Sequence, residues 1–184
     1  MRSRPALFCD IDGVLSLWGW PSGTPQSAWP DGRWADIEGI PHYLSHTAAI
    51  HLSDLQSKFD VIWASGWEER ANTHLPHALG LGPFPYLELD AARTAGHGPG
   101  EAVPSRRSVR GHWKLPSIAA WAGPDRPLAF VDDVLDERCW AWAAERSLRV
   151  PTLLVETRPP SGLDDAAAAK LHAFADGLAR DDAA

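Results

Sequence analysis

Apolar residues in this chain gather into short runs that alternate with longer stretches of helical periodicity. Residues 5–9 form an apolar run that a polar residue stops, and 59–64 and 128–131 form two similar runs further along. Short apolar runs bounded by polar or turn residues are typical of buried strands. We therefore predict strands at these positions, a fourth over 152–155 and a weaker one over 86–89.

Between these runs, apolar residues recur at a spacing of three and four, as they do in amphipathic helices. The clearest case is 42–58, where the apolar positions from Leu44 to Leu55 follow this period. Strands that alternate with helices imply right-handed crossovers and a largely parallel sheet with helices on both faces. The predicted fold is a three-layer α/β/α, Rossmann-like domain. Four more helices are predicted, over 67–79, 115–122, 136–146 and 163–179.

Three segments fit neither period. Residues 18–41 are crowded with Trp, Pro, Gly and Ser, and we predict a long ordered loop there, close to the site. Residues 91–112 combine Gly, Pro, Ser and Arg and predict a flexible basic loop, and 181–184 predict a frayed tail. Because apolar elements resume after both loops, we expect a single domain over 1–184 with a minimal cap or none.

Composition narrows the class of protein. A chain of 184 residues that is 45% hydrophobic can build one sizeable core, and its net charge of -7 disfavours a surface that tracks nucleic acid throughout. Its two cysteines, Cys9 and Cys139, have no paired spacing, so we predict no disulfide partner and no zinc site. The apolar run at the N-terminus is too short for a signal or membrane segment. These features predict a soluble cytoplasmic protein without a membrane partner.

Polar residues follow several of the predicted strands. In a doubly wound sheet the carboxyl ends of the strands border the crevice where ligands bind. Two carboxylates at positions i and i+2 after a strand point the same way, so one can attack while the other handles protons. As an isolated tetrapeptide Asp-Ile-Asp-Gly is equally compatible with a solvated turn, but its place after a buried strand favours a site. The residues collected in this way are Asp10 and Asp12, then Ser65, then Asp132 and Asp133.

Carboxylates gathered at one edge of a sheet repel one another unless a cation lies among them. Mg²⁺ is a hard cation that takes carboxylates, waters and substrate phosphate as ligands. The predicted Mg²⁺ site comprises Asp10, Asp12 and Asp133, with Asp132 as an orienting neighbour or a further ligand. An alternative for Asp132, or for Asp136, is to cap the helix that follows.

Three further residues suit the binding of a phosphoryl group. The Ser65 hydroxyl and the Gly66 amide could together hold a phosphoryl oxygen, although Ser-Gly alone is more often a helix cap. Lys114 could offset the negative charge of a nucleophile and a phosphoryl group as they meet. Arg110 and His112 compete with Lys114 for this role, and we predict that Arg110 contacts substrate.

The order of these motifs resembles that of the haloacid dehalogenase-like (HAD) superfamily of phosphohydrolases, over about residues 6–137. The segment 151–155 followed by Gly162-Leu163 is similar, more narrowly, to small domains related to the phosphatase-like module of bacterial RNA repair ("Swiss Army Knife") proteins. The motifs that carry the first resemblance are Asp10-Ile11-Asp12-Gly13-Val14, Ser65, Lys114 and Val131-Asp132-Asp133.

The resemblance implies a mechanism as well as a fold. Asp10 would form an aspartyl-phosphate, and Asp12 would protonate the leaving oxygen and then activate water. Asp133, the second residue of its pair, would be the metal ligand. The implied activity is Mg²⁺-dependent hydrolysis of a phosphomonoester, with Asp10, Asp12, Ser65 and Lys114 as the catalytic residues.

Other functions remain as alternatives. A receiver domain also uses an acidic pair, a hydroxyl and a lysine, but its phosphorylated Asp follows a middle strand and its Lys comes late. No Walker-type phosphate loop or dinucleotide fingerprint occurs. The same residues would also serve a phosphotransferase, or a catalytically idle domain that binds a metal or a partner. The substrate would be a phosphorylated small molecule or, in an open site, the phosphate of a nucleic acid or protein.

Ten tryptophans are a high number for this length. We expect those in the predicted loop to anchor it to the body of the protein, because segments without regular structure need large apolar contacts. Stacking on an aromatic or base-containing substrate is the alternative. Four tryptophans lie in the loop and two adjoin Ser65 and Lys114: Trp18, Trp20, Trp29 and Trp34, then Trp67 and Trp113.

Overall fold

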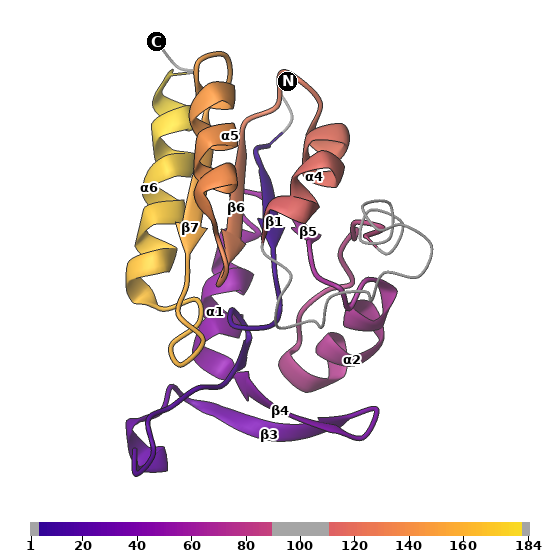
Figure 1. The fold of residues 1–184 in the computed structure, drawn as a ribbon, viewed down its shortest axis with the longest axis vertical. Coiled ribbons are helices and arrows are strands. Elements are labelled where there is room, and N and C mark those ends of the chain that lie inside the picture. The colour runs from indigo at the N-terminus through magenta and orange to yellow at the C-terminus, as the bar shows by residue number, and fades with distance from the viewer. Residues whose placement is uncertain (1–3, 90–110, 182–184) are drawn as a thin grey trace.

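The computed structural model describes residues 4–89 and 111–181 and shows a Rossmann-like α/β fold built on a four-stranded parallel sheet (Figure 1). The strand order is β5-β1-β6-β7, so the first strand of the chain is central in the sheet. Strands with helices on both sides are buried on both faces, which is why they appear in the sequence as continuous apolar runs. The four predicted strands are confirmed: β1 (Ala6–Cys9), β5 (Asp60–Trp63), β6 (Leu128–Asp132) and β7 (Thr152–Glu156).

Helices cover both faces of this sheet and form two hydrophobic clusters. Leu7 and Cys9 pack with α1 (His46–Leu55), α2 (Glu69–Leu79) and α6 (Asp165–Asp181). Ala6 and Phe8, the alternate residues of β1, point to the other face of the sheet and pack with the remaining two helices. The predicted three-layer arrangement and the five predicted helices are therefore confirmed. The two helices on this other face are α4 (Leu115–Ala122) and α5 (Glu137–Ser147).

The prediction of a loop over 18–41 is wrong for its second half. The chain there forms β3 (Gly32–Ile37), which pairs with β4 (Ile40–Ser45), and β2 (Ser16–Leu17) completes an antiparallel sheet of order β2-β4-β3. The alternation of apolar and polar positions is weak because three of the six residues of β3 are exposed and one, Ile37, is buried. Glu38 and Gly39 have φ of 56° and 78°, which a two-residue hairpin turn requires. Figure 1 shows this hairpin beyond the end of the parallel sheet at which β1 ends.

The start of the predicted helix over 42–58 is also corrected. Residues 42–45 belong to β4, and α1 begins at His46. Ser45 caps this helix, because its side-chain oxygen accepts a hydrogen bond from the Ala48 amide at 3.1 Å. A capping serine in extended conformation ends the strand and starts the helix at the same residue. The apolar period beginning at Leu44 had concealed this boundary.

Tryptophan side chains anchor the segment before β3, as predicted. The rings of Trp20 and Trp29 stack with centroids 3.9 Å apart, and the ring of Tyr43 on β4 packs edge-on against both. The Trp20 indole also donates a hydrogen bond to the Pro160 carbonyl oxygen at 3.1 Å. Trp34 is 55% exposed, and its stacking on a substrate stays a prediction. A short 3-10 helix, η1 (Gln26–Ala28), lies in this segment.

Two weaker predictions have different outcomes. The strand predicted over 86–89 is wrong, because Tyr86 makes only an isolated bridge with Trp63. Most of the predicted basic loop over 91–112, with Arg110, lies outside the described residues, and so does 182–184 of the predicted tail, whereas Asp181 ends α6. Within 4–89 and 111–181, no helix combines the length and the apolar character needed to cross a membrane.

Candidate active site

The register of the parallel sheet places Asp10 beside Asp132. Cys9 pairs with Val131, and the Asp10 amide donates a hydrogen bond to the Val131 carbonyl oxygen at 3.0 Å. Side chains alternate along a strand, so Asp10 shares the face of Phe8, and Asp132 shares the face of Phe130. Both phenylalanines belong to the cluster beneath α4 and α5. The two carboxylates therefore project from neighbouring strands toward the side that α4 covers.

Lys114 meets these carboxylates from the start of α4. It is the last residue of the 3-10 helix η2 (Gly111–Lys114), which runs directly into α4. Its Nζ lies 2.8 Å from Asp10 Oδ2 and 2.7 Å from Asp132 Oδ2. Burial alone would lower the pKa of Lys114, but the two carboxylates outweigh it and raise the pKa above its usual range. Lys114 therefore stays charged, and the structure brings it into the site as predicted.

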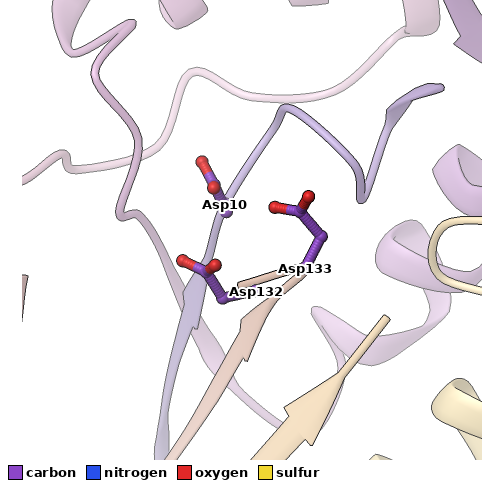
Figure 2. A group of neighbouring side chains, drawn as sticks. All are labelled: Asp10, Asp132 and Asp133. Atoms are coloured by element: carbon purple, nitrogen blue, oxygen red, sulfur yellow. The ribbon is translucent and has the colours of Figure 1, made fainter. Parts of the chain in front are cut away.

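Asp133 completes a cluster of three carboxylates at this end of the sheet. One oxygen from each of Asp10, Asp132 and Asp133 lies within 4.8 Å of the others. Figure 2 shows the three side chains grouped beyond the ends of β1 and β6. Burial, with the charges of the other two, raises the pKa of Asp133 to about 7. Burial likewise raises the pKa of Asp132 to about 6, although Lys114 opposes the shift.

Gly13 makes room for Asp133. The residue has a φ of 72°, and a Cβ at this position would overlap the Asp133 carboxylate. A glycine is therefore required on both counts, since other residues rarely adopt this conformation. The Gly13 carbonyl oxygen accepts a hydrogen bond from the buried Thr157 hydroxyl at 2.9 Å. Thr157 was missed in the sequence, although it directly follows the observed strand β7 and lies two residues after the predicted strand over 152–155.

Asp132 and Asp133 have different surroundings. Asp132 Oδ2 bonds to Lys114, and its Oδ1 accepts a hydrogen bond from the Val134 amide at 2.8 Å. These contacts suit the orienting role predicted for Asp132, which holds Lys114 in place. The alternative role as a helix cap is filled by Asp136, whose Oδ1 accepts hydrogen bonds from the Arg138 and Cys139 amides at 3.1 Å.

Asp12 lies apart from the cluster of three carboxylates. Its Oδ2 accepts a hydrogen bond from the indole Nε1 of Trp67 at 3.0 Å, and its Oδ1 lies 3.9 Å from His42 Nδ1. The side chain of Asp12 is 39% exposed, against 10% for Asp10. The structure thus separates a nearly buried carboxylate from an accessible one. The prediction that Asp12 binds metal stays a prediction.

Ser65 and Gly66 lie at the same end of the sheet, beyond β5. Ser65 is buried, and its carbonyl oxygen accepts a hydrogen bond from the Glu68 amide at 3.0 Å, which closes a turn ahead of α2. Gly66 lies within this turn and not at the first residue of the helix, which begins at Glu69. Its carbonyl oxygen accepts a hydrogen bond from Arg70 at 3.0 Å. Phosphate binding by Ser65 and Gly66 stays a prediction.

The cluster of three carboxylates fits a small divalent cation. Its donors are all oxygen atoms, and three carboxylates face one lysine, which leaves an excess of negative charge at a largely buried place. Mg²⁺ takes oxygen ligands at about 2.0–2.1 Å, so ligands on opposite sides lie about 4 Å apart. That separation falls within the 4.8 Å limit inside which the three carboxylate oxygens lie. Asp133 is better placed as a ligand than Asp132, because both oxygens of Asp132 already have partners in Lys114 and the Val134 amide. Both oxygens of Asp10 likewise have partners, in the Ile11 amide and Lys114, so Asp10 would bind the cation alongside these contacts.

Binding of Mg²⁺ should become stronger as pH rises from 6 to 8. Folding raises the pKa of Asp133 from about 3.9 in the unfolded chain to about 7. The folded protein therefore binds the proton more tightly than the unfolded chain does. Its stability falls as the pH rises through this range and the group ionises. A cation relieves this cost by binding the ionised form. We expect the increase in melting temperature on adding MgCl₂ to be several-fold larger at pH 8 than at pH 5.5.

Thermal unfolding with and without MgCl₂, at both pH values, measures this linkage. Asp133→Asn should reduce the effect of MgCl₂ at pH 8, whereas Glu156→Gln, at an exposed carboxylate on the neighbouring strand, should leave it unchanged. An equal response of the wild-type protein at both pH values would contradict the assignment of Asp133.

Comparisons of this chain with protein-family models and with curated proteins give no match. The residue types, their spacing and the geometry of the site therefore carry the functional interpretation.

Proposed function

We propose that this protein is a Mg²⁺-dependent phosphohydrolase of the haloacid dehalogenase-like superfamily that hydrolyses a phosphomonoester through an aspartyl-phosphate on Asp10. The observation that carries the proposal is the ion pair between Asp10 and Lys114, in which Asp10 Oδ2 lies 2.8 Å from the lysine Nζ. The Asp133 carboxylate lies beside Asp10 in the cluster of three carboxylates. A turn alone would not require a buried lysine between two carboxylates. Asp12, two residues from Asp10 but in different surroundings, supplies a second carboxylate for proton transfer.

The first step would transfer the phosphoryl group to the protein. An Asp10 oxygen forms a bond to phosphorus while the bond from phosphorus to the leaving oxygen breaks. Protonated Asp12 gives its proton to that oxygen, so the alcohol departs neutral. Lys114 stays charged throughout and offsets the negative charge that gathers where the two oxyanions meet. Asp10 and Asp133 would hold Mg²⁺, and the bound ion would supply further charge neutralisation.

The second step would return Asp10 to its starting state. Asp12, now a carboxylate, takes a proton from a water molecule as the oxygen of that water attacks phosphorus. The bond between phosphorus and Asp10 breaks, which releases inorganic phosphate and restores the carboxylate. The exposure of Asp12 supports this role, because both the leaving group and the water must reach it.

Release of inorganic phosphate from a panel of esters tests the proposed function. The panel contains an aryl phosphate, a small alkyl phosphate and oligonucleotides with 5′- or 3′-phosphates, each assayed with MgCl₂ and with excess chelator. We expect hydrolysis that requires Mg²⁺ and no release with chelator. Transfer to an added alcohol in preference to water would indicate a phosphotransferase. Absence of release from every ester would favour a domain that only binds.

A further inference from the structure

Asp10 and Asp12 are two residues apart but have different surroundings, and the Asp12 carboxylate accepts a hydrogen bond from Trp67. Alternation along a strand would send both side chains the same way. The strand ends at Cys9, however, and the amides of Leu15 and Ser16 donate hydrogen bonds to the Ile11 carbonyl oxygen in the turn that follows. Asp10 bonds to Lys114, whereas Asp12 accepts the indole N–H of Trp67.

Trp67 is itself held firmly. Its side chain is buried, and its ring packs edge-on against the ring of His42 with centroids 4.8 Å apart. The turn that presents it is closed by the hydrogen bond from the Glu68 amide to Ser65, and Glu68 adopts a φ of 48°. The Glu68 side chain accepts a hydrogen bond from the Leu89 amide at 2.6 Å. The indole N–H therefore has a fixed position and direction.

The chemistry of an indole suits a partner that gains and loses a proton. Its N–H can only donate, so it can bond to a carboxylate oxygen and equally to the carbonyl oxygen of a neutral carboxyl group. Because Trp67 bonds to Oδ2, proton transfer would use Oδ1. That oxygen lies on the side of His42, whose Nδ1 is 2.8 Å from Ser16 Oγ and 3.9 Å from Asp12 Oδ1.

We propose that Trp67 is a positioning residue that holds the Asp12 carboxyl group apart from the metal-binding carboxylates and directs its Oδ1 to the leaving oxygen of the substrate. This inference rests on the proposed function, because it concerns the proton donor of that reaction. Trp67 does not contact the reacting atoms; it acts through Asp12. Its hydrogen bond stays in place while Asp12 alternates between acid and base.

A proton donor speeds the reaction most when the leaving group is a strong base. The test therefore compares an ester with a good leaving group and an ester with a poor one. The p-nitrophenolate ion departs without protonation, whereas an alkoxide does not. Trp67→Phe removes the N–H and keeps an aromatic ring. We expect kcat/KM for an alkyl phosphate to fall about 10- to 100-fold and kcat/KM for p-nitrophenyl phosphate to fall less than about threefold. Trp142→Phe, at a partly buried tryptophan of α5 far from Asp12 in sequence, is the matched control and should leave both unchanged.

A double-mutant cycle shows whether Trp67 acts through Asp12. In an Asp12→Ala background, Trp67→Phe should cause no further loss with the alkyl phosphate, because the group that it positions is absent. Equal losses with the two esters, or additive losses in the cycle, would overturn the inference and leave the phosphohydrolase intact. If wild-type protein hydrolyses neither ester, the proposed function fails and this inference fails with it.

The fold of the variant is checked by its melting temperature. If Trp67→Phe does not fold, benzothienylalanine incorporated at position 67 replaces it, because this residue keeps the bicyclic shape of tryptophan and lacks the N–H. The expected selective loss with the alkyl phosphate is the same. Retention of wild-type kcat/KM for both esters in this variant would overturn the inference.

Discussion

Asp10→Asn should abolish phosphate release while the protein stays folded. The amide is almost the same size as the carboxylate, but it cannot form the aspartyl-phosphate, so kcat should fall on the order of 10⁴-fold or more. The substitution also removes one of three carboxylates that crowd the end of the sheet, which limits any loss of stability. Steady-state release of phosphate from an aryl phosphate with MgCl₂ measures the effect, and thermal unfolding confirms the fold.

A matched control separates the loss of a nucleophile from a general loss of negative charge. Glu156 pairs with Asp132 in the register of β6 and β7 but is exposed. Glu156→Gln should therefore retain kcat within about twofold, because its carboxylate is exposed and is not part of the cluster of three carboxylates. Activity of Asp10→Asn near that of the wild-type protein would exclude Asp10 as the nucleophile.

Lys114→Met should destabilise the protein by about 3 kcal/mol or more at pH 7, as well as remove activity. Removing one partner of a buried ion pair leaves the other charge uncompensated, and here two carboxylates lose the same cation. The pKa of Lys114 is raised, so its stabilising charge is fully present at pH 7 and is lost only as the pH rises through that raised value. Denaturation by urea at pH 7 measures the change.

Two comparisons distinguish this effect from a simple loss of packing. The loss should shrink near pH 5, where Asp132 and Asp133, with pKa values of about 6 and 7, take up protons. Lys58→Met removes a lysine whose Nζ lies 2.6 Å from Asp176 at a partly exposed place, and it should cost at most about 1 kcal/mol. Equal losses for the two variants, independent of pH, would contradict the electrostatic account of Lys114.

The parallel sheet was predictable because its strands are buried on both faces and appear as apolar runs. The proximity of Asp10 to Asp132 and Asp133 followed from the same pattern, since polar residues that end adjacent parallel strands must lie at one edge. The distinction between Asp132 and Asp133 depended on the exact partners of each oxygen atom, which spacing cannot show. Lys114 is buried and forms ion pairs with two of the carboxylates, whereas Arg110, its competitor in the sequence, lies outside the described residues.

The antiparallel hairpin was missed for the opposite reason. Neither strand alternates between buried and exposed residues: β3 buries Ile37 alone, and β4 buries its last three residues in a row. Aromatic packing and backbone pairing hold the hairpin. With β4 assigned to a helix, His42 could not be placed near Asp12. Trp67 offered a signal, because it follows Ser65-Gly66 at the end of a strand, but its contact with Asp12 depends on a turn whose shape is not evident in the residue types.

The most direct test of the central claim is to trap the phosphorylated protein. Wild-type protein mixed with a phosphate ester and MgCl₂, quenched in acid and digested, should yield the peptide containing Asp10 with one added phosphoryl group. Hydroxylamine should release this group, as it does from acyl phosphates, and Asp10→Asn should carry none. An active protein that shows no phosphorylated peptide, or that carries the phosphoryl group on another residue, would contradict the proposed mechanism.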